Sequence, residues 1–252
     1  MKHILGKILE NIELTEKHFL LTVKVKAKIP DVVPGQFVMV MIDDKKVFLR
    51  RPFTLYKVGE DTISIMYKVR GFGTNLLSRM KKGREISLLG PLGRGFALRN
   101  RDLYVIVAGG IGIAGVNLLI ERMKGRFQIF YGTSSSKGLA LIRNLISHDP
   151  IIATMDGSFG YKGDIISCLS QHIHYFSGVD FEILACGPKD MYVSLKNVLV
   201  TYRVPCQVLW EEKMGCGMGL CFGCAVKTEN AEHPMKRVCL EGPVFDLWDL
   251  SL

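Results

Sequence analysis

Hydrophobic and polar positions alternate in short runs through the first part of the chain, and turn residues such as Gly59 and Gly83 separate the runs. Alternation of this kind is typical of half-buried strands, because successive side chains point to opposite faces of a sheet. One helical run, over 75–81, interrupts the pattern. The pattern predicts a small antiparallel β-barrel over residues 1–98. Its expected strands cover residues 18–25, 36–41, 53–56, 62–67 and 85–89.

The rhythm changes at residue 103, where continuous apolar runs begin to alternate with stretches of helical periodicity. This alternation predicts a doubly wound parallel α/β domain over residues 99–203. Residues 204–252 form a third part, a small cysteine-containing module with an apolar tail at 243–250. The fold class is therefore multidomain β plus α/β. The expected strands are 103–110, 127–134, 151–156 and 181–188, and the expected helices are 114–123, 139–145 and two that start at 164 and 189.

Composition narrows the possible functions. The net charge of +9 is compatible with phosphate-rich cofactors, acidic partners or nucleic acid, but the basic residues are scattered and no basic segment interleaved with aromatics occurs, which disfavours nucleic acid. The run 103–120 has the length of a membrane span, yet glycines interrupt it, and a strand, turn and helix start explain it better. Seven cysteines without a secretory leader predict a reducing cytoplasm and no membrane.

Four cysteines near the C-terminus carry the clearest chemical signal. Cys216, Cys221, Cys224 and Cys239 have the spacing C-x4-C-x2-C-x14-C, which is the ligand pattern of a plant-type 2Fe-2S cluster. Glycines alternate with the first three cysteines, so that the backbone can fold closely around a cluster. The alternatives are structural zinc, which usually uses two closely spaced ligand pairs, and four inert thiols. Cys168 and Cys206 lie outside the pattern and should be dispensable for metal binding.

A candidate pyrophosphate site lies in the predicted barrel. The turn 71–74 leads into a helix, and a helix start offers free amides and a favourable dipole to phosphate. Arg51 could bind another phosphate oxygen, and Tyr56 or Tyr67 could stack on a ring. The alternative is a solvated arginine beside a bare turn. The candidate residues are Arg51, Pro52, Phe53, Thr54, Met66, Tyr67, Lys68, Gly73 and Thr74.

A candidate nucleotide site lies in the predicted α/β domain. A strand runs into the glycines of 109–112, and a second strand ends in 186–188, at the carboxyl edge where such sheets bind ligands. Together with Gly115, two of these glycines fit the G-x-G-x-x-G spacing, although no acidic residue is evident about twenty positions later. The alternatives are glycines that serve strand–helix packing and an inert core cysteine. The candidate residues are Gly109, Gly110, Gly112, Cys186, Gly187 and Pro188.

Together these motifs resemble the ferredoxin-reductase-like flavoproteins, in which an Arg-Pro-x-Ser/Thr segment holds FAD and a glycine turn with a Cys-Gly-Pro segment holds a nicotinamide nucleotide. The tail, GCGMGLCFGC at 215–224 and RVCLEGPVF at 237–245, resembles one family among them. This family is the electron-transfer subunits of heteromeric, NAD-linked dihydroorotate dehydrogenases. Two positions depart from the family pattern: Gly115 stands where proline is usual, and Thr54 replaces the commoner serine.

The resemblance implies an NAD-linked oxidoreductase subunit that exchanges hydride between NAD(H) and FAD. Electrons would pass through the 2Fe-2S cluster to the FMN of a dihydroorotate dehydrogenase catalytic subunit, in a heterotetramer that serves pyrimidine biosynthesis. It also implies that Cys186 orients the nicotinamide. The cysteine loop and the tail 243–250 would contact the partner, unless the tail closes a core. NADP stays open because of the polar segment 133–137. Alternatives are a diaphorase subunit of a hydrogenase, sulfide dehydrogenase or glutamate synthase, and a zinc-stabilised module without catalysis.

Overall fold

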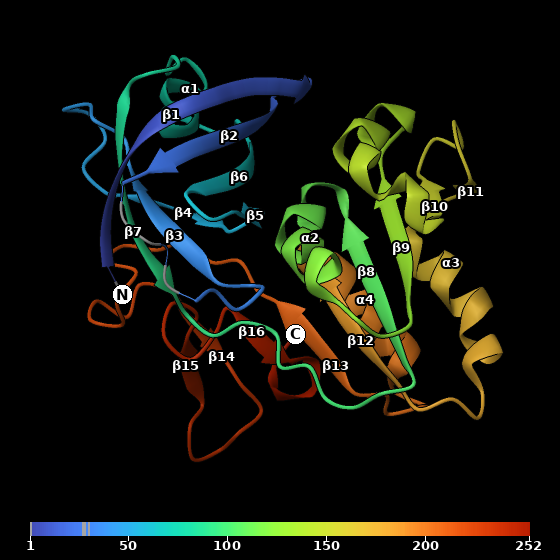
Figure 1. Cartoon of the computed structure of the whole chain (residues 1–252). Coiled ribbons are helices and arrows are strands. Elements are labelled where there is room, and N and C mark those ends of the chain that lie inside the picture. Colours follow the sequence, from blue (N-terminus) through green and yellow to red (C-terminus); the bar gives the residue numbers. More distant parts are fainter. Residues whose placement is uncertain (1, 27–28, 30) are drawn as a thin grey trace.

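The computed structural model describes residues 2–26, 29 and 31–252. Figure 1 shows a β-rich body in blue and an α/β body in green to orange, with the red C-terminal segment running below them. The described residues form two seven-stranded sheets and a two-stranded ribbon. The predicted fold class is confirmed: an antiparallel β-barrel domain, a doubly wound α/β domain and a small C-terminal module.

The first sheet is antiparallel and curves into an open half-barrel. Its strands are β1 (Lys2–Thr15), β2 (His18–Val25), β3 (Phe37–Met41), β4 (Arg51–Thr54), β5 (Lys57–Val58), β6 (Thr62–Lys68) and β7 (Glu85–Leu92). They lie in the order β4-β3-β7-β1-β2-β6-β5. Ile8, Leu21, Val38, Ile65 and Leu88 are buried on the inner face and form its core. Burial of one face explains the alternating pattern in the sequence.

Strand β1 is an element that the hydrophobic pattern does not predict. Its buried positions Ile4, Gly6 and Ile8 alternate along the strand, but one of them is glycine and the intervening Leu5 is apolar and 57% exposed. The alternation is therefore hidden in the sequence. Gly6 is needed because β1 approaches β2 closely: an added Cβ would lie 2.5 Å from Cγ1 of Val23.

Some element boundaries differ from the prediction. Helix α1 (Phe72–Ser78) begins three residues earlier than expected, because the Thr74 hydroxyl accepts a hydrogen bond from the Gly71 amide at 3.1 Å and caps the first turn. Strand β4 begins at Arg51, and β5 is too short for a periodic pattern to reveal it. Strand β7 continues to Leu92 beyond the predicted end.

The second sheet is parallel except for its last strand. Its strands are β8 (Leu103–Gly109), β9 (Phe127–Thr133), β10 (Ile151–Thr154), β11 (Tyr161–Lys162), β12 (Phe181–Cys186), β13 (Cys206–Leu209) and the antiparallel β16 (Val244–Asp246). They lie in the order β11-β10-β9-β8-β12-β13-β16. The helices are α2 (Ile113–Arg122), α3 (Ile165–His172), α4 (Lys189–Leu199) and the 3₁₀ helices η1 (Gly110–Gly112), η2 (Ser136–His148), η3 (Ile173–Phe176) and η4 (Leu247–Asp249).

Helices cover both faces of this sheet. Val105 and Val107 of β8 belong to the core that includes Leu195 of α4, whereas Ile106 belongs to the core that includes Val116 of α2. Burial on both faces explains why these strands are continuous apolar runs. Within the ranges that the structure describes, no helix is long and apolar enough to cross a membrane.

The C-terminal part is joined to the second sheet more closely than a separate module would be. Residues after 203 contribute β13 and β16 to that sheet, and β14 (Ala225–Lys227) pairs with β15 (Met235–Arg237) in the ribbon. The division into domains at 1–98, 99–203 and 204–252 stays a prediction. The second sheet extends across the predicted boundary at residue 203.

Candidate functional site

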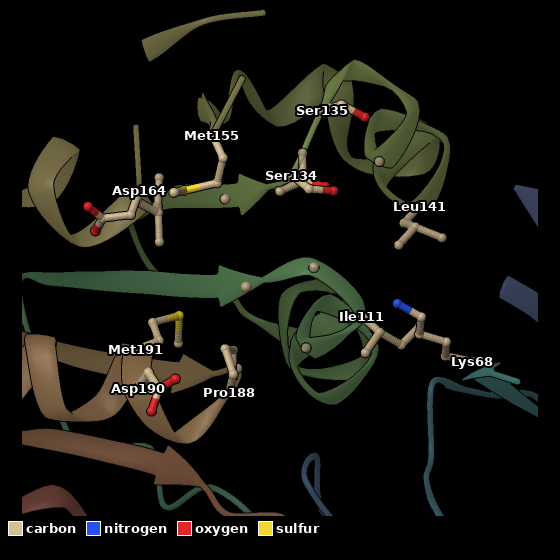
Figure 2. Close-up of a pocket in the computed structure, with 18 of the residues that line it drawn as sticks. Lys68, Ile111, Ser134, Ser135, Leu141, Met155, Asp164, Pro188, Asp190 and Met191 are labelled. Atoms are coloured by element: carbon tan, nitrogen blue, oxygen red, sulfur yellow. The ribbon is translucent and has the colours of Figure 1, made fainter. Parts of the chain in front are cut away.

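Two cavities open between the barrel domain and the α/β domain. The large cavity, of about 1060 Å³, is lined by residues 109–112, 132–135 and 187–192 and, from the barrel, by residues 15–18. The narrow cavity, of about 210 Å³, is lined mainly by residues 52–54, 66–68, Thr74 and 209–212. Figure 2 shows that strand ends and helix starts surround the large cavity, as expected at the carboxyl edge of a parallel sheet.

The narrow cavity collects most of the residues predicted to hold a flavin. Pro52, Phe53 and Thr54 line it from β4, and Met66, Tyr67 and Lys68 line it from β6, with Thr74 at one end. Arg51 and Gly73 lie beside this wall and close to each other, since a Cβ added at Gly73 would lie 3.2 Å from the Arg51 Nε atom. The structure thus brings together residues from three separate segments.

The aromatic part of this wall is held in place by neighbouring rings. Tyr67 stacks on Phe19 and meets Phe53 edge-on, each with ring centroids 5.6 Å apart. Its hydroxyl donates to Asn11 Oδ1 at 3.0 Å, and burial raises the pKa of Tyr67 well above the usual value. The other candidate, Tyr56, does not line the cavity. Of the two tyrosines, Tyr67 is therefore the one placed to contact a flat ring there.

At the start of α1, the backbone amides are available to a ligand, whereas the Thr74 hydroxyl is already engaged in hydrogen bonds. The Thr74 hydroxyl already accepts from the amides of Arg70 and Gly71, at 2.9 and 3.1 Å. The first amides of α1 have no carbonyl one turn earlier to bind, so they are available to a phosphate. With the guanidinium of Arg51 beside them, these amides suit the pyrophosphate of FAD.

The glycines of the large cavity serve different purposes. Gly110 has a φ of 52°, and a Cβ added there would meet no atom within 4 Å, so this position faces open space. A Cβ at Gly112 would lie 2.1 Å from the carbonyl oxygen of Cys186, so Gly112 is needed for packing against β12. Gly110 is the glycine at which a nucleotide can approach the backbone closely.

Cys186 lies behind the wall of the large cavity. Its side chain is buried and lines neither cavity. Burial, with a smaller effect of Glu211, raises the pKa of the Cys186 thiol and keeps it protonated. A Cβ at Gly115 would lie 2.5 Å from Cys186 Sγ, so the unusual glycine makes room for this thiol. The predicted contact of Cys186 with nicotinamide stays a prediction.

The turn after Cys186 is fixed by Tyr192. The Gly187 amide donates to the Tyr192 hydroxyl at 2.9 Å, and that hydroxyl donates to the Leu209 carbonyl at 2.5 Å. This pair of bonds connects the ends of β12 and β13. Gly187 and Pro188 consequently line the large cavity in a defined position.

The sequence analysis missed two residues that separate the cavities. Trp210 and Glu211 line both of them. Trp210 stacks on Tyr192 with centroids 5.7 Å apart, and its buried Nε1 finds no hydrogen-bond partner among the described residues. Both residues directly follow β13, so the rule that ligands bind at carboxyl strand ends could have identified them.

The four cysteines of the tail are arranged as two pairs. The Cys216 amide lies 3.5 Å from Cys221 Sγ, and the Cys239 amide lies 3.5 Å from Cys224 Sγ. The Gly219 amide, which is 3.1 Å from Cys239 Sγ, connects the loop that carries the first pair to the second pair. Two thiol pairs suit a binuclear cluster, with one pair for each iron.

Backbone amides favour the thiolate of Cys216, whereas burial, followed by the neighbouring Cys224, raises the pKa of Cys239 to about 12. Burial alone would raise the pKa of Cys216, but amide hydrogen bonds, chiefly from Met218 and Cys221, lower it to about 6. Arg237 orders the same loop, since its Nη1 donates to the Gly219 carbonyl at 2.8 Å and its guanidinium lies 4.7 Å from the Phe222 ring centroid. The donor set of four sulfurs with amides directed at them fits a 2Fe-2S cluster.

Comparisons with known proteins agree with this geometry. Residues 211–251 match the iron-sulfur cluster binding domain of dihydroorotate dehydrogenase B. The electron transfer subunit of NAD(+)-dependent dihydroorotate dehydrogenase B from Caldanaerobacter subterraneus subsp. tengcongensis is 35% identical over 95% of this chain and 95% of its own. The subunit from Clostridium acetobutylicum is 33% identical over 97% and 95%.

The chain belongs to the dihydroorotate dehydrogenase B electron transfer subunits. This membership confirms the resemblance seen in the sequence, and the predicted C-terminal iron-sulfur module is confirmed with it. A solved chain of the NADH-dependent reduced ferredoxin-NADP oxidoreductase has the same fold as this electron transfer subunit. The TM-score is 0.83 at 23% identity, over 98% of this chain and 89% of the other.

Proposed function

We propose that the chain carries electrons between NAD(H) and the FMN of a dihydroorotate dehydrogenase catalytic subunit, as part of pyrimidine biosynthesis. FAD would occupy the narrow cavity, NAD(H) the large cavity and a 2Fe-2S cluster the cysteine loop. When bound, FAD supplies the conversion between hydride transfer and single-electron transfer. The names of the relatives, all electron transfer subunits, support this assignment.

The observation that carries the proposal is the continuity of the three sites. Trp210 and Glu211 form a wall that both cavities share, so the ligands of the two cavities lie next to each other. Met214 lines the narrow cavity and stands two positions before Cys216. The chain therefore leads directly from the nucleotide to the flavin and from the flavin to the cluster.

The residues of the chain bind and orient, and no side chain needs to transfer a proton. In this proposal Arg51 and the first amides of α1 hold the FAD pyrophosphate, while Phe53 and Tyr67 contact the ring system. The open backbone at Gly110 receives the pyrophosphate of NAD(H). NAD is proposed over NADP because the relatives are named as NAD(+)-dependent, and the cytoplasm is proposed as the compartment because thiolate ligands need reducing surroundings.

The catalytic partner would dock on the cysteine loop. Leu220 and Phe222 are 76% and 62% exposed, although both are apolar and adjacent to cluster ligands. The tail 243–250 is a different case: Phe245, Leu247 and Leu250 are buried in the core. The sequence led us to expect that the tail also contacts the partner, but its apolar side chains are buried. We therefore propose the loop alone as the docking site. From the family resemblance alone, we propose that the complex is a heterotetramer with two copies of each chain.

Coexpression with the FMN-containing catalytic subunit tests the proposal. The complex should contain FAD, FMN and iron, and it should oxidise dihydroorotate with NAD. The chain alone should reduce only artificial acceptors with NADH. Dihydroorotate oxidation by the isolated chain, or failure of the two chains to associate, would refute the assignment.

A glycine pair tests the nucleotide site separately. Gly110→Ala places a methyl group into the large cavity and should raise the KM for NADH several-fold while FAD stays bound, with a stability cost of about 1–2 kcal/mol from the left-handed backbone. Gly112→Ala forces a contact with the β12 backbone and should lower stability by more than Gly110→Ala, with a smaller effect on the KM. Stopped-flow reduction of the flavin by NADH and thermal unfolding measure the two effects, and equal effects of both changes would refute the placement.

A further inference from the structure

The barrel domain contributes a positively charged wall to the large cavity. Lys17 lies in the turn between β1 and β2 and His18 begins β2, while Lys68 ends β6 and Arg70 follows it by two residues. Glu16 is the carboxylate among the barrel residues that line the cavity. Figure 2 shows the ammonium group of Lys68 directed toward the side of the cavity formed by the α/β domain.

The wall that the α/β domain forms carries more carboxylates than cations. The α/β domain lines the cavity with the carboxylates of Asp164, Asp190 and Glu211 but with the cations of Lys137 and Lys189 only, among the residues that the structure describes. A pyrophosphate finds amides on this wall, yet it meets more carboxylates than cations. The barrel wall, with Lys17, Lys68 and Arg70 against Glu16, supplies the excess of positive charge, and attraction in a partly enclosed cavity is stronger than in open water.

The turn is fixed in position by its own hydrogen bonds. Lys17 has a φ of 61°, and its amide donates to Glu13 Oε1 at 2.8 Å. Its carbonyl accepts from the Val69 amide at 2.8 Å, which ties the turn to the end of β6. His18 is paired with Lys68 in the strand register, so the two side chains are neighbours. The backbone that carries Lys17 and His18 is therefore fixed before a ligand binds.

His18 is set to respond to an anion. Its Nδ1 lies 2.7 Å from the Glu16 carbonyl and donates to it, which leaves Nε2 free of that bond. Burial, and then the charges of Lys68 and Arg70, lower the pKa of His18. A phosphate bound among these groups counters the repulsion from Lys68 and from Arg70. It therefore raises the pKa of His18 and favours the imidazolium.

We propose that Lys17 and His18 bind the pyrophosphate of NAD(H), so that the dinucleotide is held between the glycine turn and the barrel domain. Both residues line the large cavity and not the narrow one, which assigns them to the nucleotide and not to FAD. This inference rests on the proposed function and extends its nucleotide site across the domain boundary.

The test uses the complex with its FAD and partner subunit. Lys17→Asn removes the charge and tolerates the left-handed backbone, and His18→Gln removes the imidazole. Each should raise the KM for NADH about fivefold and the pair about 20-fold, at unchanged kcat. The matched control Lys7→Ala, an exposed lysine of β1 outside both cavities, should leave the KM unchanged.

A reductant without phosphate distinguishes weaker binding of the NADH pyrophosphate from a general loss of flavin reduction. Reduction of the flavin by 1-benzyl-1,4-dihydronicotinamide should be equal in the parent and in all variants, and the FAD content should be unchanged. An unchanged KM for NADH, equal losses with both reductants, or loss of FAD would overturn the inference while NADH reduction by the parent still supports the proposed function. Failure of NADH to reduce the parent would overturn both.

Discussion

Two segments of the C-terminal module are rich in apolar residues, but the structure places them differently. The cysteine loop at 215–224 directs Leu220 and Phe222 to solvent, whereas the tail at 243–250 buries Phe245 and Leu247. The tail pairs with β13 over Val244–Asp246, which places Phe245 in the core, and the helix η4 that follows directly buries Leu247. The loop has its amides directed at sulfur atoms, and its side chains are left to point outward. Backbone pairing, more than apolar content, decides which segment stabilises the fold and which can bind a partner.

Removal of a cluster ligand should have the largest effect. Cys224→Ser takes one thiolate from the second pair, and we expect loss of the cluster and of its visible absorption while FAD stays bound. Iron and acid-labile sulfide analysis measures this. Cys168→Ala and Cys206→Ala change buried cysteines outside the pairs and should keep close to two irons per chain. Zinc without sulfide in the parent would refute the cluster.

The buried tail predicts the next largest effect. Leu247 is fully buried, so Leu247→Ala should lower the free energy of unfolding by about 2–5 kcal/mol. Leu220→Ala should change it by less than about 0.5 kcal/mol, because that side chain is exposed. Denaturant unfolding of both variants provides the comparison. A larger loss for Leu220→Ala would reverse the roles that we assign to the two segments.

A substitution in the exposed cysteine loop should have a smaller effect, limited to the affinity for the catalytic subunit. Leu220→Ser should weaken the affinity for the catalytic subunit about tenfold without a change in iron content or stability. Ile146→Ser, an exposed aliphatic residue of η2, should leave that affinity unchanged. Titration of one subunit with the other measures the affinities. Equal effects of the two substitutions would show that the partner docks elsewhere.

The sequence predicted most of the architecture because one pattern of hydrophobic and polar positions dominates each domain. Continuous apolar runs identified β8, β9, β10 and β12, since these strands are buried on both faces. The cysteine spacing identified the iron-sulfur module, because ligand identity and spacing are local properties of the chain. The residues of 52–54 and 66–68 line one cavity, and Arg51 lies beside it.

What the sequence could not predict depends on contacts between distant segments. Strand β1 was missed because Gly6 interrupts its apolar alternation, and only the approach of β2 explains that glycine. Cys186 follows an apolar strand to the ligand edge, yet packing against Gly115 turns its thiol away from the cavities. Lys17 in the β1–β2 turn and His18 at the start of β2 belong to no recognisable motif, and the domain arrangement alone places them at the large cavity.

Electron paramagnetic resonance after anaerobic addition of NADH tests the central claim most directly. NADH should bleach the flavin of the purified chain and produce the signal of a reduced 2Fe-2S cluster in the parent. The Cys224→Ser variant should bleach its flavin and give no cluster signal. A parent that holds the cluster, bleaches its flavin with NADH and shows no reduced cluster would contradict the proposed path from nucleotide to flavin to iron.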